Sequence, residues 1–321
     1  MTSDLVKRVV RREPLATAGK SGSRLERGWL DDGSVVILKH SSVDEDWTMQ
    51  ATGDQDRIAL LWNEGVFEHI PSVIQHAVLD VQRTDTGTLV VMEDVSAFLF
   101  TNGQQIRQEH DRLLGALAEM HRTFVGRPLP ALCPLDRLYA FLSPQVCSHF
   151  SMSYEVPRLA TEGWARFHDI VPKDVSSVIE AIHARPADLG DALSLRESTL
   201  IHGDAKMANL GVTADGRRLV LLDWGTLSAF GPPAIDFAWY LAINKAAIGR
   251  DHEQLLEDAR THLVPVDEDA LRLALLGALV QLGWEKALGA TADDPTIRQT
   301  ERNGLAWWID RAREAVESWP D

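Results

Sequence analysis

The sequence predicts an α+β fold with two lobes, and three observations support this prediction. Between residues 15 and 92, short apolar runs of extended character are separated by turn residues. After residue 104, apolar residues recur mostly at the period of an α-helix. A polar segment at residues 200–225 interrupts the helices. We therefore expect a small β-rich lobe at residues 1–95, a larger, mainly helical lobe at residues 96–321, and a ligand site in the cleft between them.

The small lobe is expected to contain strands at residues 25–30, 35–39, 74–79 and 88–92. Asp31, Asp32 and Gly33 separate the first two of these strands, and an Asp-Gly pair in this setting favours a hairpin. Residues 58–70 carry apolar side chains close to helical period, so they are expected to form one helix. Residues 41–56 are polar and acidic, and we expect an exposed connection there.

In the large lobe, residues 104–124 form the strongest amphipathic pattern and predict a long helix. Prolines at positions 128, 130 and 134 are expected to end that helix. Helical segments follow through residue 192, and the chain is predicted to be helical again after Pro233, including residues 270–288 and 304–319.

Composition narrows the possible partners. The chain has 321 residues, 45% of them apolar, and a formal net charge of −15. This charge argues against nucleic acid as a partner, because phosphate backbones require basic surface, and it leaves a cationic small molecule among the candidates. Cys133 and Cys147 alone imply neither a disulfide framework nor a cysteine zinc site. No apolar run is long enough to span a bilayer and the N-terminus lacks an apolar signal core, so we expect a cytoplasmic protein without a membrane partner.

The segment from Leu200 to Gly225 supplies the groups that phosphoryl transfer from ATP requires. Asp204 is the candidate base that accepts a proton from an attacking hydroxyl, and Lys206 could reach the transferred phosphate as a point charge. Asn209 and Asp223 offer the amide and carboxylate oxygens that Mg2+ prefers. We therefore predict that Asp204 and Lys206 are catalytic residues and that Asn209 and Asp223 are ligands of Mg2+.

A resemblance to the aminoglycoside phosphotransferase family rests on His202-Gly203-Asp204, Asn209 and Asp223-Trp224-Gly225. That family belongs to the protein-kinase-like superfamily, which also contains choline kinases. The resemblance covers nearly the whole chain and implies a bilobal protein-kinase-like fold, with a nucleotide-binding small lobe and a large lobe that holds the catalytic loop and the substrate site. It implies an enzyme that uses ATP and Mg2+ to phosphorylate a hydroxyl group.

The length of the segment after Asp223 bears on the acceptor. Protein kinases use a long stretch there to dock a peptide and close it with Ala-Pro-Glu, whereas this chain reaches Asp236 quickly and lacks that triplet. The acceptor is therefore expected to be a small hydroxylated molecule, such as an aminoglycoside, an amino sugar or an amino alcohol. Its identity, the choice between ATP and GTP, and the oligomeric state stay open.

The resemblance also implies which residues hold the nucleotide. Lys39 would bind the α- and β-phosphates, with Glu64 as its preferred ion-pair partner and Glu68, one helical turn away, as the alternative. The loop that covers the phosphates with its backbone N–H groups would comprise Gly19, Ser21, Gly22 and Ser23. The hinge that pairs with the adenine edge would comprise Met92, Glu93, Asp94 and Val95.

Other interpretations of these residues remain open. The loop lacks the full Gly-x-Gly-x-x-Gly pattern and is also compatible with a plain polar turn. Asp236 would bond the catalytic loop, or it is only the N-terminal cap of a helix. The chain could also be a non-catalytic nucleotide-binding or partner-binding module on the same fold. Against that stands the presence of all four groups that such modules usually lose, namely Lys39, Asp204, Asn209 and Asp223.

Overall fold

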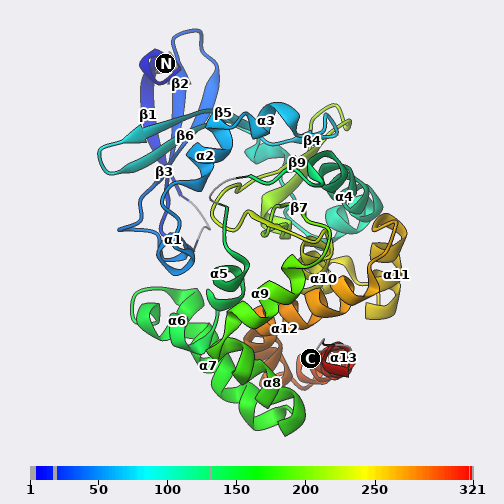
Figure 1. Cartoon of the computed structure of the whole chain (residues 1–321). Helices are drawn as coiled ribbons and strands as arrows, with labels where there is room; N and C mark the ends of the chain where they lie inside the picture. The colour runs from blue at the N-terminus through cyan, green and yellow to red at the C-terminus, as the bar shows by residue number, and fades with distance from the viewer. Residues whose placement is uncertain (1–4, 17–19, 130–131, 318, 320–321) are drawn as a thin grey trace.

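The structure is a computed structural model that describes residues 5–16, 20–129, 132–317 and 319 (Figure 1). A sheet forms most of its first part and helices form most of its second part, which confirms the predicted α+β fold with two lobes. None of the described helices combines the length and the apolar character needed to span a membrane.

The small lobe is built on a five-stranded antiparallel sheet in the order β1-β2-β3-β6-β5. These strands are β1 (Val9–Leu15), β2 (Arg24–Leu30), β3 (Val35–Ser41), β5 (Val78–Thr84) and β6 (Gly87–Glu93), and a short 3-10 helix, η1 (Val6–Arg8), precedes them. The predicted turn at residues 31–33 joins β2 to β3, with Gly33 at a φ of 84°. Val36 and Leu38 of β3 pack into a core on one face of the sheet. Because side chains alternate along a strand, Lys39 points to the opposite face.

Two predictions for the small lobe are corrected. The connection at residues 41–56 contains a helix, α1 (Trp47–Thr52), and Trp47 is only 3% exposed, so the prediction of an exposed connection was wrong. The predicted helix at residues 58–70 is divided into α2 (Arg57–Asn63) and α3 (Val66–His69). Gly65, at a φ of 67°, lies between them and adopts the left-handed conformation that glycine tolerates best.

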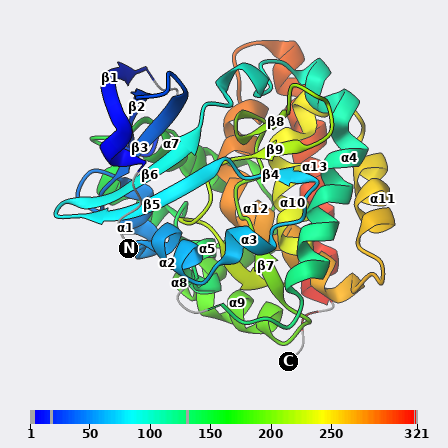
Figure 2. The ribbon, with the colours of Figure 1, turned by 90° about the horizontal axis from the view of Figure 1, so that it is seen from above.

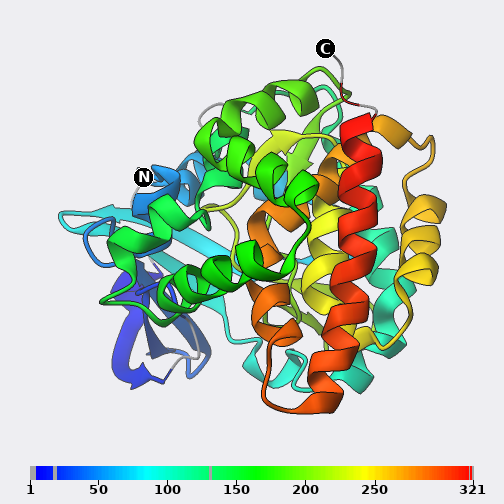
Figure 3. The same ribbon diagram turned by 90° about the horizontal axis from the view of Figure 1, so that it is seen from below.

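The large lobe is mainly helical. Its helices are α4 (Gly103–Phe124), α5 (Leu135–Ala140), α6 (Pro144–Phe150), α7 (Glu155–Ile170), α8 (Lys173–Ala184), α9 (Pro186–Ser194), α10 (Ala234–Ile248), α11 (His252–His262), α12 (Glu268–Ala290) and α13 (Pro295–Glu317). A short 3-10 helix, η2 (Ser96–Phe98), follows the small-lobe sheet. Helix α12 is buried along most of its length and packs against α7, α10 and α13 (Figure 3). This packing places the main core of the lobe around α12.

Short strands lie where the two lobes meet. They are β4 (Ile74–Gln75), β7 (Thr199–Ile201), β8 (Leu210–Val212), β9 (Leu219–Leu221) and β10 (Ala229–Gly231), with the 3-10 helix η3 (Met207–Asn209) before β8. Strand β7 pairs with β10, and β9 lies between β4 and β8. Figure 2 shows β4, which precedes the last two strands of the small-lobe sheet, running beside β9. The division between residues 95 and 96 stays a prediction.

Candidate active site

Four strands, β3, β7, β8 and β9, bring the candidate residues to one place between the lobes. The loop that carries Asp204 starts where β7 ends, and Asp223 follows β9 after one intervening residue. Leu222 N donates a hydrogen bond to Asn209 O at 2.9 Å, which extends the β8–β9 ladder and puts Asn209 beside the turn that carries Asp223. Lys39 reaches the same turn from β3.

Asp204 lies at the centre of the loop and is 6% exposed. Its Oδ2 accepts hydrogen bonds from Lys206 Nζ at 2.6 Å and from Asn209 Nδ2 at 3.0 Å. Burial, which the charge of Lys206 only partly offsets, raises the pKa of Asp204. Burial alone would lower the pKa of Lys206. The negative charges of Asp204 and Asp223 outweigh burial and raise that pKa. The three charges therefore act on one another within a single site.

The pKa of Asp223 is shifted in the opposite direction from that of Asp204. Lys39 Nζ donates to Asp223 Oδ1 at 2.5 Å, and the charge of Lys39 holds the pKa of Asp223 well below its usual range. Burial alone would lower the pKa of Lys39, but the charge of Asp223 raises it. Asp223 is thus kept ionised, whereas Asp204 is more basic than an ordinary aspartate. Such opposite pKa shifts in two neighbouring acids are typical of sites where the two have different roles.

The turn at Asp223 has an unusual backbone. Asp223 has a φ of 70° and Gly225 a φ of 113°, both in the left-handed region. Trp224, between them, points inward: its ring meets that of His202 edge-on at 4.6 Å, and its Nε1 donates to Leu221 O at 2.7 Å. Non-glycine residues with positive φ concentrate at functional sites, where the surrounding structure holds them in place. Here the anchored Trp224 holds the Asp223 carboxylate towards Lys39.

Helix α10 holds the loop that carries Asp204. Asp236 is fully buried, and its two oxygens accept hydrogen bonds from His202 N at 2.8 Å and Gly203 N at 2.7 Å. His121 Nε2 of α4 lies 2.9 Å from Asp236 Oδ2. Burial alone would raise the pKa of Asp236, but the hydrogen bond with His121 outweighs it and lowers that pKa. The predicted bond between Asp236 and the loop that carries Asp204 is confirmed, and Asp236 is not the N-terminal cap of α10, which is Pro233.

Asn244 of α10 also supports the loop that carries Asp204, a role that was not predicted. Asn244 Oδ1 accepts from Met207 N at 2.8 Å, and its Nδ2 donates to Ala205 O at 2.9 Å. Asn244 lies eight residues after Asp236, so the two side chains share a face of the helix. That spacing of polar residues in an otherwise apolar helix was the available signal for this role.

The predicted partner of Lys39 is replaced by another residue. Glu64 lies at the exposed end of α2, Glu68 is exposed on α3, and in the described part of the chain neither forms an ion pair with Lys39. The ion pair between Lys39 and Glu64 is therefore absent from this structure. Besides Asp223, the acid whose charge acts on Lys39 is Asp46, the buried N-terminal cap of α1. Sequence patterns missed Asp46 because α1 itself was not predicted.

The small-residue loop lies against the start of α1. Gly19 falls outside the described residues. Ser23 Oγ donates to Asp46 Oδ2 at 2.9 Å, and Ser21 O accepts from the backbone N–H of α1. Gly22 has a φ of 120°, and a Cβ added there would collide with the Glu45 carbonyl oxygen. Glycine is therefore required at position 22 by both conformation and space.

The hinge candidates lie at the end of β6. Met92 pairs with Ile37 of β3, and Glu93 N donates to Ala77 O at 2.8 Å. The side chain of Asp94 binds Arg27 Nε at 3.1 Å and caps Ser96, so its carboxylate is engaged within the protein. Val95 is buried. The role of residues 92–95 towards the adenine edge stays a prediction.

The oxygen donors of the site fit a hard divalent cation. Asp223 Oδ2 and Asn209 Oδ1 have no hydrogen-bond partner among the described residues, whereas Asp223 Oδ1 and Asn209 Nδ2 are engaged by Lys39 and Asp204. One carboxylate that stays ionised and one neutral amide oxygen form a ligand set that suits Mg2+, which usually binds one or two protein oxygens and keeps its remaining positions for water and phosphate.

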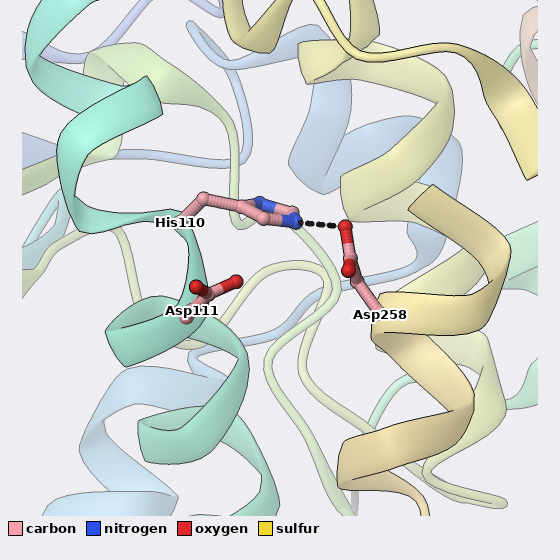
Figure 4. Close-up of side chains that lie close together, drawn as sticks. All are labelled: His110, Asp111 and Asp258. Atoms are coloured by element: carbon pink, nitrogen blue, oxygen red, sulfur yellow. Dashed lines mark hydrogen bonds and ion pairs between the residues drawn. The ribbon is translucent and has the colours of Figure 1, made fainter. Parts of the chain in front are cut away.

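A second cluster of ionisable side chains lies away from this site, between α4 and α11. Figure 4 shows His110, Asp111 and Asp258 within reach of one another. His110 Nε2 lies 3.2 Å from Asp258 Oδ2, and its Nδ1 lies 3.0 Å from Tyr240 Oη. Arg250 Nη1 lies 2.5 Å from Asp258 Oδ2 and 3.5 Å from Asp111 Oδ1. Arg250 therefore pairs with carboxylates of both helices, and this cluster ties α4 to α11.

Comparison with known proteins completes the description of the site. The model of a family described as the phosphotransferase enzyme family matches residues 16–275. No curated protein matches the chain. Among solved structures, a choline/ethanolamine kinase family protein from Mesorhizobium loti has 14% identity and a TM-score of 0.54 over 95% of this chain and 92% of that chain.

Two further solved structures share the fold. A choline kinase from Cryptosporidium parvum has 10% identity and a TM-score of 0.51, over 95% of this chain and 90% of that chain. An aminoglycoside phosphotransferase from Streptomyces rimosus, in complex with ADP and streptomycin, has 15% identity and a TM-score of 0.50, over 82% of this chain and 94% of that chain. At such identities the likeness concerns the fold alone, and it confirms the bilobal protein-kinase-like fold.

Proposed function

The chain belongs to the phosphotransferase enzyme family, and we propose that it transfers the γ-phosphate of ATP to a hydroxyl group of a small molecule. The observation that carries this proposal is the convergence of Lys39, Asp204, Asn209 and Asp223 between the lobes, where they are linked by hydrogen bonds and ion pairs. A cytoplasmic location, where ATP is available, is part of the proposal.

Each residue has a proposed task in the transfer. Asp204 would orient the acceptor hydroxyl and take its proton, and its raised pKa favours that task. Lys206, held on Asp204 Oδ2, would place a positive charge beside the transferred phosphate. Lys39 would bind the α- and β-phosphates. Asn209 and Asp223 would hold Mg2+, which neutralises charge on the phosphate oxygens when bound.

The acceptor is proposed to be an aminoglycoside, an amino sugar or an amino alcohol. Only a short segment separates Asp223 from Asp236, which leaves little chain for docking a peptide. The net charge of −15 favours the approach of a cationic molecule. The names of the similar structures, a choline kinase and an enzyme in complex with streptomycin, supply the first acceptors to test.

The test is nucleotide consumption across a panel of hydroxylated amines, with ATP and GTP and with Mg2+ present. Asp204→Asn should reduce turnover by roughly 100-fold or more, because the base is lost while the shape is kept. Asp215→Asn is the matched control, since Asp215 lies in the exposed β8–β9 turn of the same segment. Turnover that survives Asp204→Asn unchanged would remove the mechanism. Nucleotide binding without turnover of any acceptor would instead favour a non-catalytic module.

A further inference from the structure

Trp47, the first residue of α1, connects the small lobe to the large lobe. Its ring lies near three aromatic rings of the large lobe, with centroid distances of 6.2 Å to Phe141, 5.9 Å to Phe150 and 6.5 Å to Tyr154. These residues lie at the end of α5, at the end of α6 and just before α7. Figure 1 shows α1 at the lower end of the small lobe, beside α5 and above α6. The apolar side of Trp47 is therefore buried against the large lobe.

The polar groups of Trp47 hold the loop that precedes β2. Trp47 Nε1 donates to Lys20 O at 2.9 Å, and Trp47 N donates to Ser21 O at 3.0 Å. The adjacent Asp46 accepts from Ser23 Oγ at 2.9 Å. Residues 20–23 thus rest on the start of α1 through both backbone and side-chain contacts.

The large lobe also contacts this loop directly. Tyr154 Oη donates to Glu45 O at 2.8 Å, which fixes the chain just before Trp47. Lys20 Nζ lies 2.7 Å from Glu155 Oε2, at the start of α7. This ion pair is exposed and contributes little stability by itself, so the buried contacts of Trp47 carry most of the connection.

We propose that Trp47 is a positioning residue for the phosphate-covering loop, and that Tyr154 acts on the loop through it. This inference rests on the proposed function, because the same family resemblance that implies ATP binding implies that Ser21, Gly22 and Ser23 cover the nucleotide phosphates. Backbone N–H groups bind phosphate only where the loop holds them at hydrogen-bond distance. Helices α5–α7 of the large lobe therefore set the position of a loop in the small lobe, and nucleotide affinity depends on a hydroxyl group of the large lobe.

Two conservative substitutions separate positioning from simple packing. Trp47→Phe keeps an aromatic ring and removes the Nε1–H group, and Tyr154→Phe keeps the ring and removes the hydroxyl. Trp164→Phe is the matched control, because the buried Trp164 Nε1 donates to Leu142 O at 2.7 Å within the large lobe, and the rings beside it are those of Phe167 and His183. All three variants lose one hydrogen bond to a backbone carbonyl.

The first measurement is calorimetric binding of the Mg2+ complex of a non-hydrolysable ATP analogue to the full chain. We expect Trp47→Phe and Tyr154→Phe to weaken binding by about 5- to 10-fold, the equivalent of one hydrogen bond. Trp164→Phe should bind like the unmodified protein. Unchanged affinity in Trp47→Phe, or an equal loss in all three variants, would overturn the inference.

The second measurement does not depend on nucleotide. Amide hydrogen exchange should accelerate in the peptide that covers residues 20–24 in Trp47→Phe and Tyr154→Phe, but not in Trp164→Phe. If the unmodified chain binds no nucleotide, the proposed function fails, and exchange at residues 20–24 still decides whether Trp47 holds the loop. Exchange that is unchanged in Trp47→Phe contradicts the positioning role.

Discussion

Lys39 and Asp223 form an ion pair, 2.5 Å from Nζ to Oδ1, that joins the central strand of the small lobe to the turn after β9. Each residue is also proposed to bind a ligand: Lys39 would bind the nucleotide phosphates, and Asp223 would bind Mg2+. Their mutual contact raises the pKa of Lys39 and lowers that of Asp223, so both groups stay charged. The pair therefore keeps the two proposed binding groups ready before either ligand arrives.

Asp223→Asn should abolish the Mg2+ dependence of nucleotide binding. The amide keeps the size of the side chain, but it removes the negative charge that the cation needs. Calorimetry with an ATP analogue, with Mg2+ and with EDTA, measures the difference. In the unmodified chain Mg2+ should tighten binding, and in Asp223→Asn the two affinities should converge. A variant that still responds fully to Mg2+ would rule out Asp223 as a ligand.

Lys206→Met should move the acid limb of the activity profile to higher pH. Asp204 must be unprotonated to act as a base, so activity is present above its pKa and is lost as the pH falls through it. Burial raises that pKa, and the charge of Lys206 lowers it, so removing Lys206 raises it further. The measurement is kcat/KM as a function of pH for both proteins. A midpoint that stays in place or moves to lower pH would contradict this arrangement.

Asp236→Ala tests how much stability the buried hydrogen bonds of Asp236 contribute. It would leave His121 and two backbone N–H groups of the catalytic loop without their buried acceptor, so the free energy of unfolding should fall by about 3 kcal/mol. Asp251→Ala, which removes the exposed N-terminal cap of α11, should cost about 1 kcal/mol. Denaturant unfolding compares the two variants. Equal losses would mean that the buried hydrogen bonds of Asp236 contribute no more stability than an exposed cap.

His183 should make the protein less stable in mild acid. Burial lowers the pKa of His183 to about 4, and its Nε2 lies 3.0 Å from Val280 O of α12. The unfolded chain takes up a proton below a pH of about 6.5, whereas the folded chain resists it down to about 4. Stability should therefore fall across that window as the pH decreases, by up to about 3 kcal/mol.

His183→Gln supplies the comparison for that pH effect. It keeps a hydrogen-bond donor near the Val280 carbonyl and removes the titrating group. Thermal unfolding between pH 7 and pH 4 should show a shallower loss of stability for the variant. Parallel curves for the two proteins would show that His183 does not contribute to acid sensitivity.

The convergence of Asp204, Asn209 and Asp223 was predictable because its signal is local. Asp204, Asn209 and Asp223 lie within residues 200–225, and each sits at a fixed distance from a short apolar strand. The lobes were predictable for the same reason, since strand and helix periods change near residue 95. The contact of His121 with Asp236 was not predicted, because 115 residues separate the two in the sequence.

Trp47 shows why the remaining features escaped prediction. Its immediate neighbours are polar, so a pattern of local hydrophobicity indicates an exposed segment. Its apolar contacts come from Phe141, Phe150 and Tyr154, which are distant in sequence and become neighbours only in the folded chain. Likewise, the exposure of Glu64 follows from the end of α2 before Gly65, and no helical periodicity in residues 58–70 indicated that break.

The parallel pairing of β4 with β9 has a consequence for any attempt to separate the lobes. Ile74 and Gln75 supply one flank of the strand that leads to Asp223. A fragment that starts at residue 96 would lack this flank, and the N–H and C=O groups on that side of β9 would be open to pairing with another chain. The helical half produced alone should therefore self-associate. A fragment with residues 72–76 fused to it, or supplied as a separate peptide, would have that edge of β9 covered.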